Sequence, residues 1–240
     1  LGGSLAVAGT WSGSNTTSIS LTTDNASLSS TVELSLASLQ TNGHDFKLAS
    51  AATDLTIKNA FALSGSETLS THGADLIFES SADISTESTL DAGDGGKFEF
   101  KQGGTADGTI NAESAVFKIV ADYTVPGTLK TNSTTTWELG TSNLDLSGGT
   151  LELGGNVVLD NIFTNNRTRF ELAEDATVTR NTGFTLRKLK LNNNTFTLGS
   201  DTTDLTLDTS ASLVVAEVTA VTTPTIDTTP NYKFSSTKAG

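Results

Sequence analysis

The chain contains no cysteine and no methionine in 240 residues, and only three prolines and two histidines. The absence of cysteine excludes disulfide bonds and thiol chemistry. It fits a secreted bacterial-type protein whose stability comes from an extended backbone ladder. No run of 18 apolar residues is present, so the sequence predicts no membrane-spanning helix. The segment from Leu1 to Gly9 is mildly apolar but has no cationic region, and we interpret it as the start of a processed chain rather than as an intact signal peptide.

Positive charge is also scarce. The 14 basic residues stand against 27 acidic residues, which gives a net charge of −13. This balance argues against nucleic acid and anionic membrane surfaces as partners. It favours solubility outside the cell and is compatible with divalent cations. We therefore expect a secreted or cell-surface protein.

Helical periodicity is missing as well. Hydrophobic residues make up 35% of the chain, and no window places them at i, i+3, i+4 and i+7 over three turns. Much of the rest of the chain consists of residues that favour turns and strands over helices, namely Thr, Ser, Gly, Asn and Asp. The sequence therefore predicts an all-β protein.

Two markers recur along the chain with the same period. A Thr-Leu or Thr-Ile step returns at spacings of 21, 20, 19 and 22 residues. Seven or eight residues after the apolar residue of the first four steps comes an apolar-x-apolar triplet. The steps begin at Thr68, Thr89, Thr109, Thr128 and Thr150, and the triplets are Leu76/Phe78, Phe98/Phe100, Phe117/Ile119 and Trp137/Leu139. A fixed period near 20 residues is the signature of a solenoid.

The period predicts a single-stranded parallel β-helix with about 20 residues and three short strands per coil, and we expect the right-handed form. Such short strands are stable only when stacked on neighbouring coils about 4.8 Å away. In each step we expect Leu to point into a dry core and Thr to point outward. An antiparallel sandwich is the alternative, with hairpin signals at Asn42-Gly43, Asp94-Gly95 and Asp107-Gly108, but it does not explain the period.

The repeat also divides the chain. Residues 1–30 are predicted to be an entry or capping segment, residues 31–215 the β-solenoid and residues 216–240 an extended tail. The tail contains Pro224 and Pro230, and proline is excluded from central strands.

The segments Gly148-Gly149-Thr150-Leu151-Glu152-Leu153-Gly154-Gly155 and Pro126-Gly127-Thr128-Leu129 resemble the coils of bacterial autotransporter passengers and filamentous-haemagglutinin-like adhesins. The resemblance covers roughly residues 30–215 and concerns architecture. It implies a secreted, surface-displayed β-helix with a structural or adhesive role. It transfers no catalytic residues, because the matching positions are core columns.

Candidate ligand residues lie in the polar corners between strands. His44 and His72 have Asp45 and Asp75 nearby, which is compatible with a metal site. We favour solvated corners, because two histidines 28 residues apart need not share a column in a period near 20. The Gly/Asp corners at 91–96 and 103–108 could hold calcium, but the tandem Gly-Gly-x-Gly-x-Asp repeat is absent. We therefore predict no metal and no cofactor.

Charge is distributed unevenly along the chain. Residues 1–96 contain only two basic residues, whereas residues 167–190 contain six. Opposite charges in the two regions could meet between subunits, or the basic residues could pair with Glu171, Glu174 and Asp175 in the same coil. The predicted subunit-contact residues are Trp11, Arg167, Arg169, Arg180, Arg187, Pro224, Pro230, Tyr232 and Phe234.

Three functions remain open. The first is an extracellular structural subunit that assembles end to end into a cell-surface fibre or matrix filament, because the end of a sheet offers unpaired backbone groups. The second is an adhesin segment that binds a cell surface or glycan. The third is a polysaccharide lyase or hydrolase, which requires clustered carboxylates with a basic residue in a groove. We prefer the first and expect no enzymatic activity.

Overall fold

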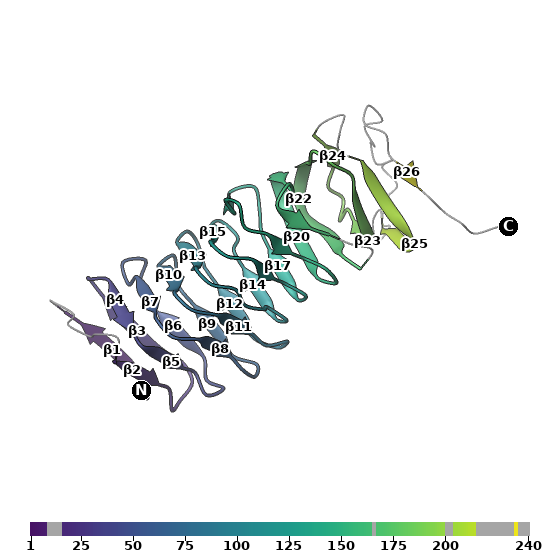
Figure 1. Ribbon diagram of the computed structural model, residues 1–240. Helices are drawn as coiled ribbons and strands as arrows, with labels where there is room; N and C mark the ends of the chain where they lie inside the picture. The colour runs from purple at the N-terminus through teal and green to yellow at the C-terminus, as the bar shows by residue number, and fades with distance from the viewer. Residues whose placement is uncertain (9–15, 165–166, 200–203, 215–232, 235–240) are drawn as a thin grey trace.

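The computed structural model describes residues 1–8, 16–164, 167–199, 204–214 and 233–234. These residues form parallel stacked coils of about 21 residues, and every strand pair among them is parallel. The predicted β-solenoid is therefore confirmed. Figure 1 shows the coils following one another along a rod from the N-terminal end. In the described ranges no helix is long and apolar enough to cross a membrane.

The largest sheet, here the long sheet, runs the length of the rod. Its strands in spatial order are β1 (Ser4–Val7), β3 (Ala26–Ser30), β6 (Phe46–Leu48), β9 (Thr68–Ser70), β12 (Thr89–Asp91), β14 (Thr109–Asn111), β17 (Thr128–Lys130), β20 (Thr150–Val158), β22 (Arg169–Thr179), β23 (Phe184–Lys190), β25 (Leu205–Val214) and β26 (Lys233–Phe234), and β24 (Phe196–Leu198) also pairs with β22.

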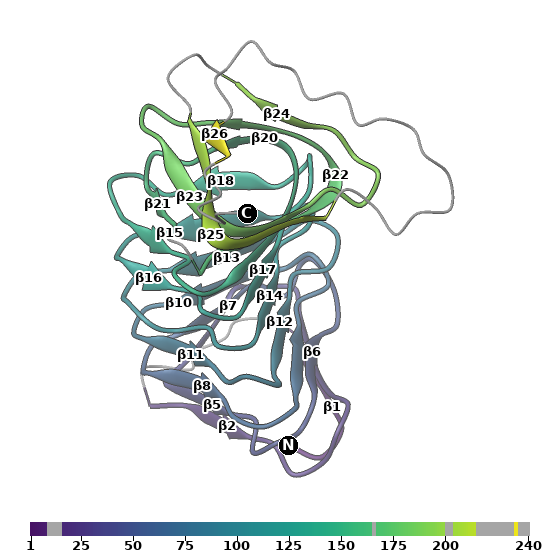
Figure 2. The ribbon, with the colours of Figure 1, turned by 90° about the vertical axis from the view of Figure 1, so that its right-hand side faces the viewer.

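The other sheets are shorter. The six-stranded sheet contains β4 (Leu34–Leu36), β7 (Leu55–Ile57), β10 (Asp75–Phe78), β13 (Lys97–Phe100), β15 (Val116–Ile119) and β18 (Thr136–Glu138). Three small sheets contain β2 (Ser18–Ser20) with β5 (Ser38–Gln40), β8 (Phe61–Leu63) with β11 (Ala82–Ile84), and β16 (Tyr123–Thr124) with β19 (Leu144–Asp145) and β21 (Ile162–Phe163). Figure 2 shows β5, β8 and β11 along one side of the rod and β12, β14 and β17 along another.

The Thr-Leu steps form one column of the long sheet, as predicted. Thr68, Thr89, Thr109, Thr128 and Thr150 are direct register partners. The Leu or Ile that follows each of them is fully buried. The apolar triplets are likewise partners in the six-stranded sheet. Because side chains alternate along a strand, each coil adds its Leu to a continuous core and its Thr to the outer face.

Aromatic rings continue from coil to coil inside the rod. The Phe78 and Phe100 rings stack with centroids 5.2 Å apart, and Phe117 lies 5.8 Å from Phe100. Tyr123 lies 4.5 Å from Phe100 and donates its buried hydroxyl to the Ala82 carbonyl at 2.7 Å. The hydrogen bond satisfies the one polar atom of this ring, and it spans two coils, because Ala82 and Tyr123 are 41 residues apart.

Glycine sets how closely the coils approach at one corner. A Cβ on Gly108, Gly127 or Gly149 would lie 2.1, 2.0 or 2.2 Å from a backbone oxygen of the preceding coil. These three glycines precede the Thr-Leu or Thr-Ile steps at Thr109, Thr128 and Thr150. The repeated Gly-Thr pair is therefore a packing requirement at the corner.

The expected hairpin signals are corners of the coil instead. Asn42 and Gly43 have φ values of 54° and 82°, and Gly95 has a φ of 94°. These left-handed conformations turn the chain toward the next face of the same coil. Asn192 and Asn193, at φ values of 49° and 65°, do the same, because asparagine tolerates the left-handed conformation.

The coil changes shape near Thr150. From here the strands of the long sheet lengthen, and β20, β22 and β25 have 9, 11 and 10 residues. The register of β20 against β22 shifts between Leu153 and Gly155. The sequence predicts two separate short strands at Leu151/Leu153 and Val157/Leu159, but Gly154 and Gly155 let one bent strand cover both positions.

The entry and tail segments are described in part. In the entry segment, β1 pairs with β3 and β2 pairs with β5. In the tail, only Lys233 and Phe234 are described, as β26 beside β25.

Candidate functional site

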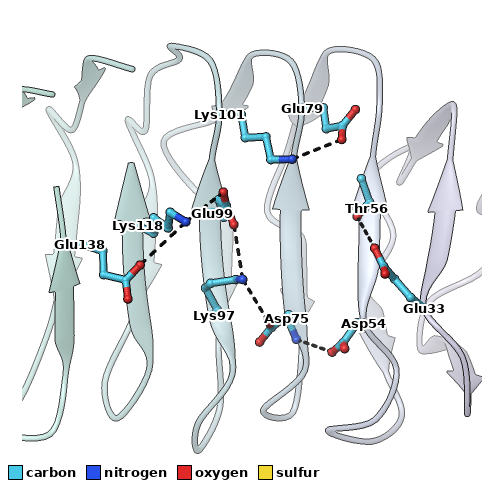
Figure 3. Close-up of polar contacts among 10 residues, drawn as sticks. All are labelled: Glu33, Asp54, Thr56, Asp75, Glu79, Lys97, Glu99, Lys101, Lys118 and Glu138. Carbon is cyan, nitrogen blue, oxygen red and sulfur yellow. Dashed lines mark hydrogen bonds and ion pairs between the residues drawn. The ribbon is translucent and has the colours of Figure 1, made fainter. Parts of the chain in front are cut away.

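The outer face of the six-stranded sheet carries a row of charged side chains, here called the charge ladder (Figure 3). Its members are Glu33, Asp54, Lys58, Asp75, Glu79, Lys97, Glu99, Lys101, Lys118 and Glu138. They lie outward because they alternate with, or directly follow, the buried residues of each strand. Neighbouring coils thus present their charges to one another.

The central part of the ladder alternates in sign. Lys97 Nζ lies 3.2 Å from Asp75 and 3.3 Å from Glu99, and Lys118 Nζ lies 3.3 Å from Glu99 and 3.9 Å from Glu138. Figure 3 shows these side chains bridging successive strands. Each lysine therefore joins two carboxylates, at least one of them on a different coil.

Glu99 is the most buried carboxylate of the ladder, with a side chain 10% exposed. Burial alone would raise its pKa, but hydrogen bonds and charge from Lys118 and Lys97 outweigh burial, so the pKa of Glu99 is lowered. An ionised carboxylate held between two lysines can stabilise positive charge, but it is not placed to donate a proton near neutral pH.

A second row of ion pairs lies two residues farther along the strands, at the next outward position. Glu79 lies 2.9 Å from Lys58 and 3.3 Å from Lys101. The hydrogen bond from Lys58, aided by Lys101, lowers the pKa of Glu79 against the opposing effect of burial. The N-terminal end of the ladder is acidic by contrast. Glu33 accepts a hydrogen bond from Thr56 and Asp54 accepts one from the Asp75 amide, and neither has an ion pair in the described part of the chain.

The outer face of the long sheet is also paired from coil to coil. Asp91 accepts hydrogen bonds from Asn111 at 2.9 Å and Ser70 at 3.4 Å. Farther along, Lys130 pairs with Glu152 at 3.3 Å. These contacts use the outward polar groups within the chain, so they stabilise the stack and leave few of these groups for a ligand.

The basic region at 167–190 pairs partly with itself. Glu171 lies 3.0 Å from Lys188 and 3.4 Å from Lys190. Burial would raise the pKa of Glu171, but the two lysines lower it. The alternative of pairing within this region is therefore realised for Glu171, and across coils, because β22 stacks on β23.

The four predicted contact arginines do not form one cluster. Arg169 is the register partner of Lys188 and donates to the Gly148 carbonyl at 3.3 Å. Arg180 follows the far end of β22 and donates to Thr164 at 3.5 Å, and burial lowers its pKa despite Asp160. Arg167 and Arg187 are exposed, Arg167 just before β22 and Arg187 in the middle of β23.

The other predicted contact residues fall largely outside the described residues. Trp11, Pro224, Pro230 and Tyr232 lie there. Phe234 is part of β26, and its backbone is the register partner of Leu207. The contact predictions for these residues therefore stay predictions.

The two histidines lie in separate corners. His44 Nδ1 is 2.9 Å from Asp24, and this hydrogen bond lowers the pKa of Asp24. His72 Nδ1 is 3.2 Å from the Ser70 hydroxyl, and its φ of 49° is left-handed. No group of three His, Asp or Glu side chains that could hold a metal occurs among the described residues.

Glu67 is a polar residue that the sequence pattern missed. It stands in a corner beside the Thr68-Leu69 step, but only 1% of it is exposed. One carboxylate oxygen accepts hydrogen bonds from the Thr41 hydroxyl at 2.7 Å and the Ser64 amide at 2.6 Å. Glu67 thereby joins two coils at the core boundary.

The N-terminal end of the rod differs from its sides. Among the described strands, β1, β2 and β4 each have a neighbour on one side only, namely β3, β5 and β7. Leu5, Val7 and Val32 are partly buried against the core at this end. Two parallel strand edges, those of β1 and β2 in the first coil, and the end of the apolar core therefore face the same direction.

Comparison of the chain with protein-family models, with curated proteins and with solved structures finds no match.

Proposed function

We propose that this chain is an extracellular structural subunit that stacks end to end with further copies to form a cell-surface fibre or matrix filament. The observation that carries the proposal is the pair of one-sided strands β1 and β2 in the first coil of the rod. Their free edges offer backbone N–H and C=O groups to a further parallel coil. Leu5, Val7 and Val32 would continue the apolar column of that coil.

Charge favours a head-to-tail arrangement. Residues 1–96 contain eleven acidic and two basic residues, whereas residues 167–190 contain six basic and three acidic residues. Contact between the acidic part of one copy and the basic part of another lowers the electrostatic energy, whereas contact between two acidic parts raises it. Stacking with one polarity would therefore be preferred.

The sides of the rod favour growth along the axis over lateral association. The charge ladder carries both signs, and each of its lysines contacts a carboxylate of the same chain. Lateral contact would require these ion pairs to be desolvated without new partners. The solvated ladder thus protects the sides, as charges on exposed sheets commonly do.

Location outside the cell is part of the proposal. It is supported by the acidic composition and by the lack of cysteine, and by the resemblance to surface-displayed passengers and adhesins noted above. We do not propose glycan processing, because Glu79 and Glu99 are held ionised by lysines.

The proposal is tested by changing the open end. The double variant Leu5→Lys/Val7→Lys adds two positive charges where a second copy would pack, and Val120→Lys adds one at a side chain that is 53% exposed on the flank. The native chain and V120K are expected to elute in the void volume and to form fibres in electron micrographs. The double variant is expected to elute as a species of 24.8 kDa.

Circular dichroism of all three proteins checks that the coils remain folded. A native chain that stays monomeric at concentrations on the order of 10 μM would refute the proposal. Fibres that survive the double variant would refute the role of this end.

A further inference from the structure

A hollow of about 280 Å³ lies on the outer surface of β20, β22 and β24, the strands near the C-terminal part of the rod (Figure 1). Its lining residues are Gly155, Asn156, Asp175, Ala176, Thr177, Thr195 and Thr197. Asn156, Thr177 and Thr197 are register partners, so their side chains form one outward row across three coils. The hollow is separate from the charge ladder, which ends at Glu138.

The bend in the strands creates the hollow. Between the two paired halves, β20 has the single residue Gly154, whereas β22 has three, namely Ala173, Glu174 and Asp175. Gly155 has a φ of 70°, and a Cβ there would lie 2.5 Å from the Ser133 Cα. Only glycine fits at this position. The hollow therefore depends on the local geometry of the bend and is not a gap between regular coils.

Most of the polar side chains of the hollow have no hydrogen-bond partner among the described residues. The side chains of Asn156, Thr177, Thr195 and Thr197 make no hydrogen bond to any described residue. One oxygen of Asp175 accepts the Thr195 amide at 2.7 Å, which leaves the second available. On the charge ladder, and at Asp91 and Lys130 on the same long sheet, outward polar groups bond from coil to coil. Donors and acceptors that line one hollow and are not used within the described residues are available to a ligand.

The chemistry of these groups selects the ligand class. Three hydroxyls and one amide can each donate and accept, and the Asp175 carboxylate accepts. This set matches a ligand covered with hydroxyl groups and offers little to an apolar or an anionic one. Asp175 is the only charged lining residue, and the net charge of the chain is −13, so acidic ligands are disfavoured.

We propose that this hollow binds one sugar residue of a neutral glycan. Its volume is at the small end of the range for ligand pockets, about 300 Å³, which suits a single ring. No aromatic side chain lines the hollow, so stacking on the sugar face is absent and the Kd for a monosaccharide is on the order of 1 mM. Such a site does not depend on fibre formation, although repeated copies in a fibre would raise the avidity.

The test measures saturation-transfer NMR and chemical-shift titrations of the full chain with D-glucose, D-galactose, D-mannose and N-acetyl-D-glucosamine. At least one of them is expected to bind. The double variant Thr177→Val/Thr197→Val removes two hydroxyls but keeps β-branched strand residues, and it is expected to weaken that binding about tenfold or more.

Thr109→Val is the matched control, because Thr109 is an outward threonine of β14 on the long sheet, outside the hollow. It is expected to leave binding unchanged. D-galacturonate is expected to bind more weakly than D-galactose. Failure of all four neutral sugars to bind, equal binding by T177V/T197V and the native chain, or tighter binding of the acidic sugar would each overturn the proposal.

Discussion

Replacing Gly127 by alanine places a methyl group where the neighbouring coil already lies. The added Cβ would be 2.0 Å from the Gly108 carbonyl oxygen and 2.4 Å from that of Asp107. Both contacts are to backbone, which cannot rotate away as a side chain can. The φ of Gly127 is not in the left-handed region, so alanine is tolerated by the local backbone and only the stacking opposes it.

The cost can be estimated from the bonds that must open. The Gly127 amide donates to Ala106 O and the Thr128 amide donates to Gly108 O, each at 2.9 Å. Moving the corner outward weakens both bonds, at about 1 kcal/mol each. Overpacking against the backbone adds about 1–3 kcal/mol. We expect Gly127→Ala to lower the free energy of unfolding by about 3–5 kcal/mol.

Urea denaturation followed by circular dichroism measures this loss. Gly140→Ala is the matched control, because Gly140 is also in a corner but nothing lies within 4 Å of the position that an added Cβ would take. Its φ of 58° costs alanine about 1 kcal/mol. If G127A were no more destabilised than G140A, the inference that the coils pack too closely at the Gly-Thr corner to admit a side chain would be refuted.

Two further substitutions test contacts between coils. Glu99→Gln removes the charge held by Lys97 and Lys118, and we expect a loss of about 1–2 kcal/mol at neutral pH by urea denaturation. Because the pKa of Glu99 is lowered in the folded state, its stabilisation is complete above the unfolded-state pKa of about 4.3 and is lost as the pH falls through the lowered value. The native chain and E99Q should therefore converge in stability in acid, and a constant difference down to about pH 2 would contradict the ion pairs. Tyr123→Phe leaves the buried Ala82 carbonyl without its donor and should cost about 1–2 kcal/mol in the same assay, whereas a neutral effect would refute that hydrogen bond.

The core of the solenoid was predictable because it repeats. Leu69, Leu90 and Ile110 recur at one period, and the structure pairs them in one buried column. A period of two within each strand and of about 20 between strands leaves one parallel register that buries all of them. The long strand that begins at Thr150 was harder to predict from the sequence. Whether two short strands merge there depends on the bend at Gly154 and Gly155, and the apolar pattern does not show that bend.

The polar contacts between coils were harder still to predict from the sequence. Glu79 and Lys101 are 22 residues apart and pair across neighbouring coils, and that spacing was available in the sequence. The spacing alone does not predict the ion pair, because the pattern does not show which outward positions align. Asn156, Thr177 and Thr197 also lie 21 and 20 residues apart and pair in register, but the bend between Leu153 and Gly155 that shapes the hollow is not visible in the pattern.

Stacking along the solenoid axis is tested most directly by X-ray fibre diffraction from aligned filaments of the chain. The strands lie across the rod, so end-to-end growth predicts the strand-spacing reflection at about 4.8 Å on the meridian, parallel to the filament axis. The same reflection on the equator would mean that the rods associate side by side, and it would contradict the proposed assembly.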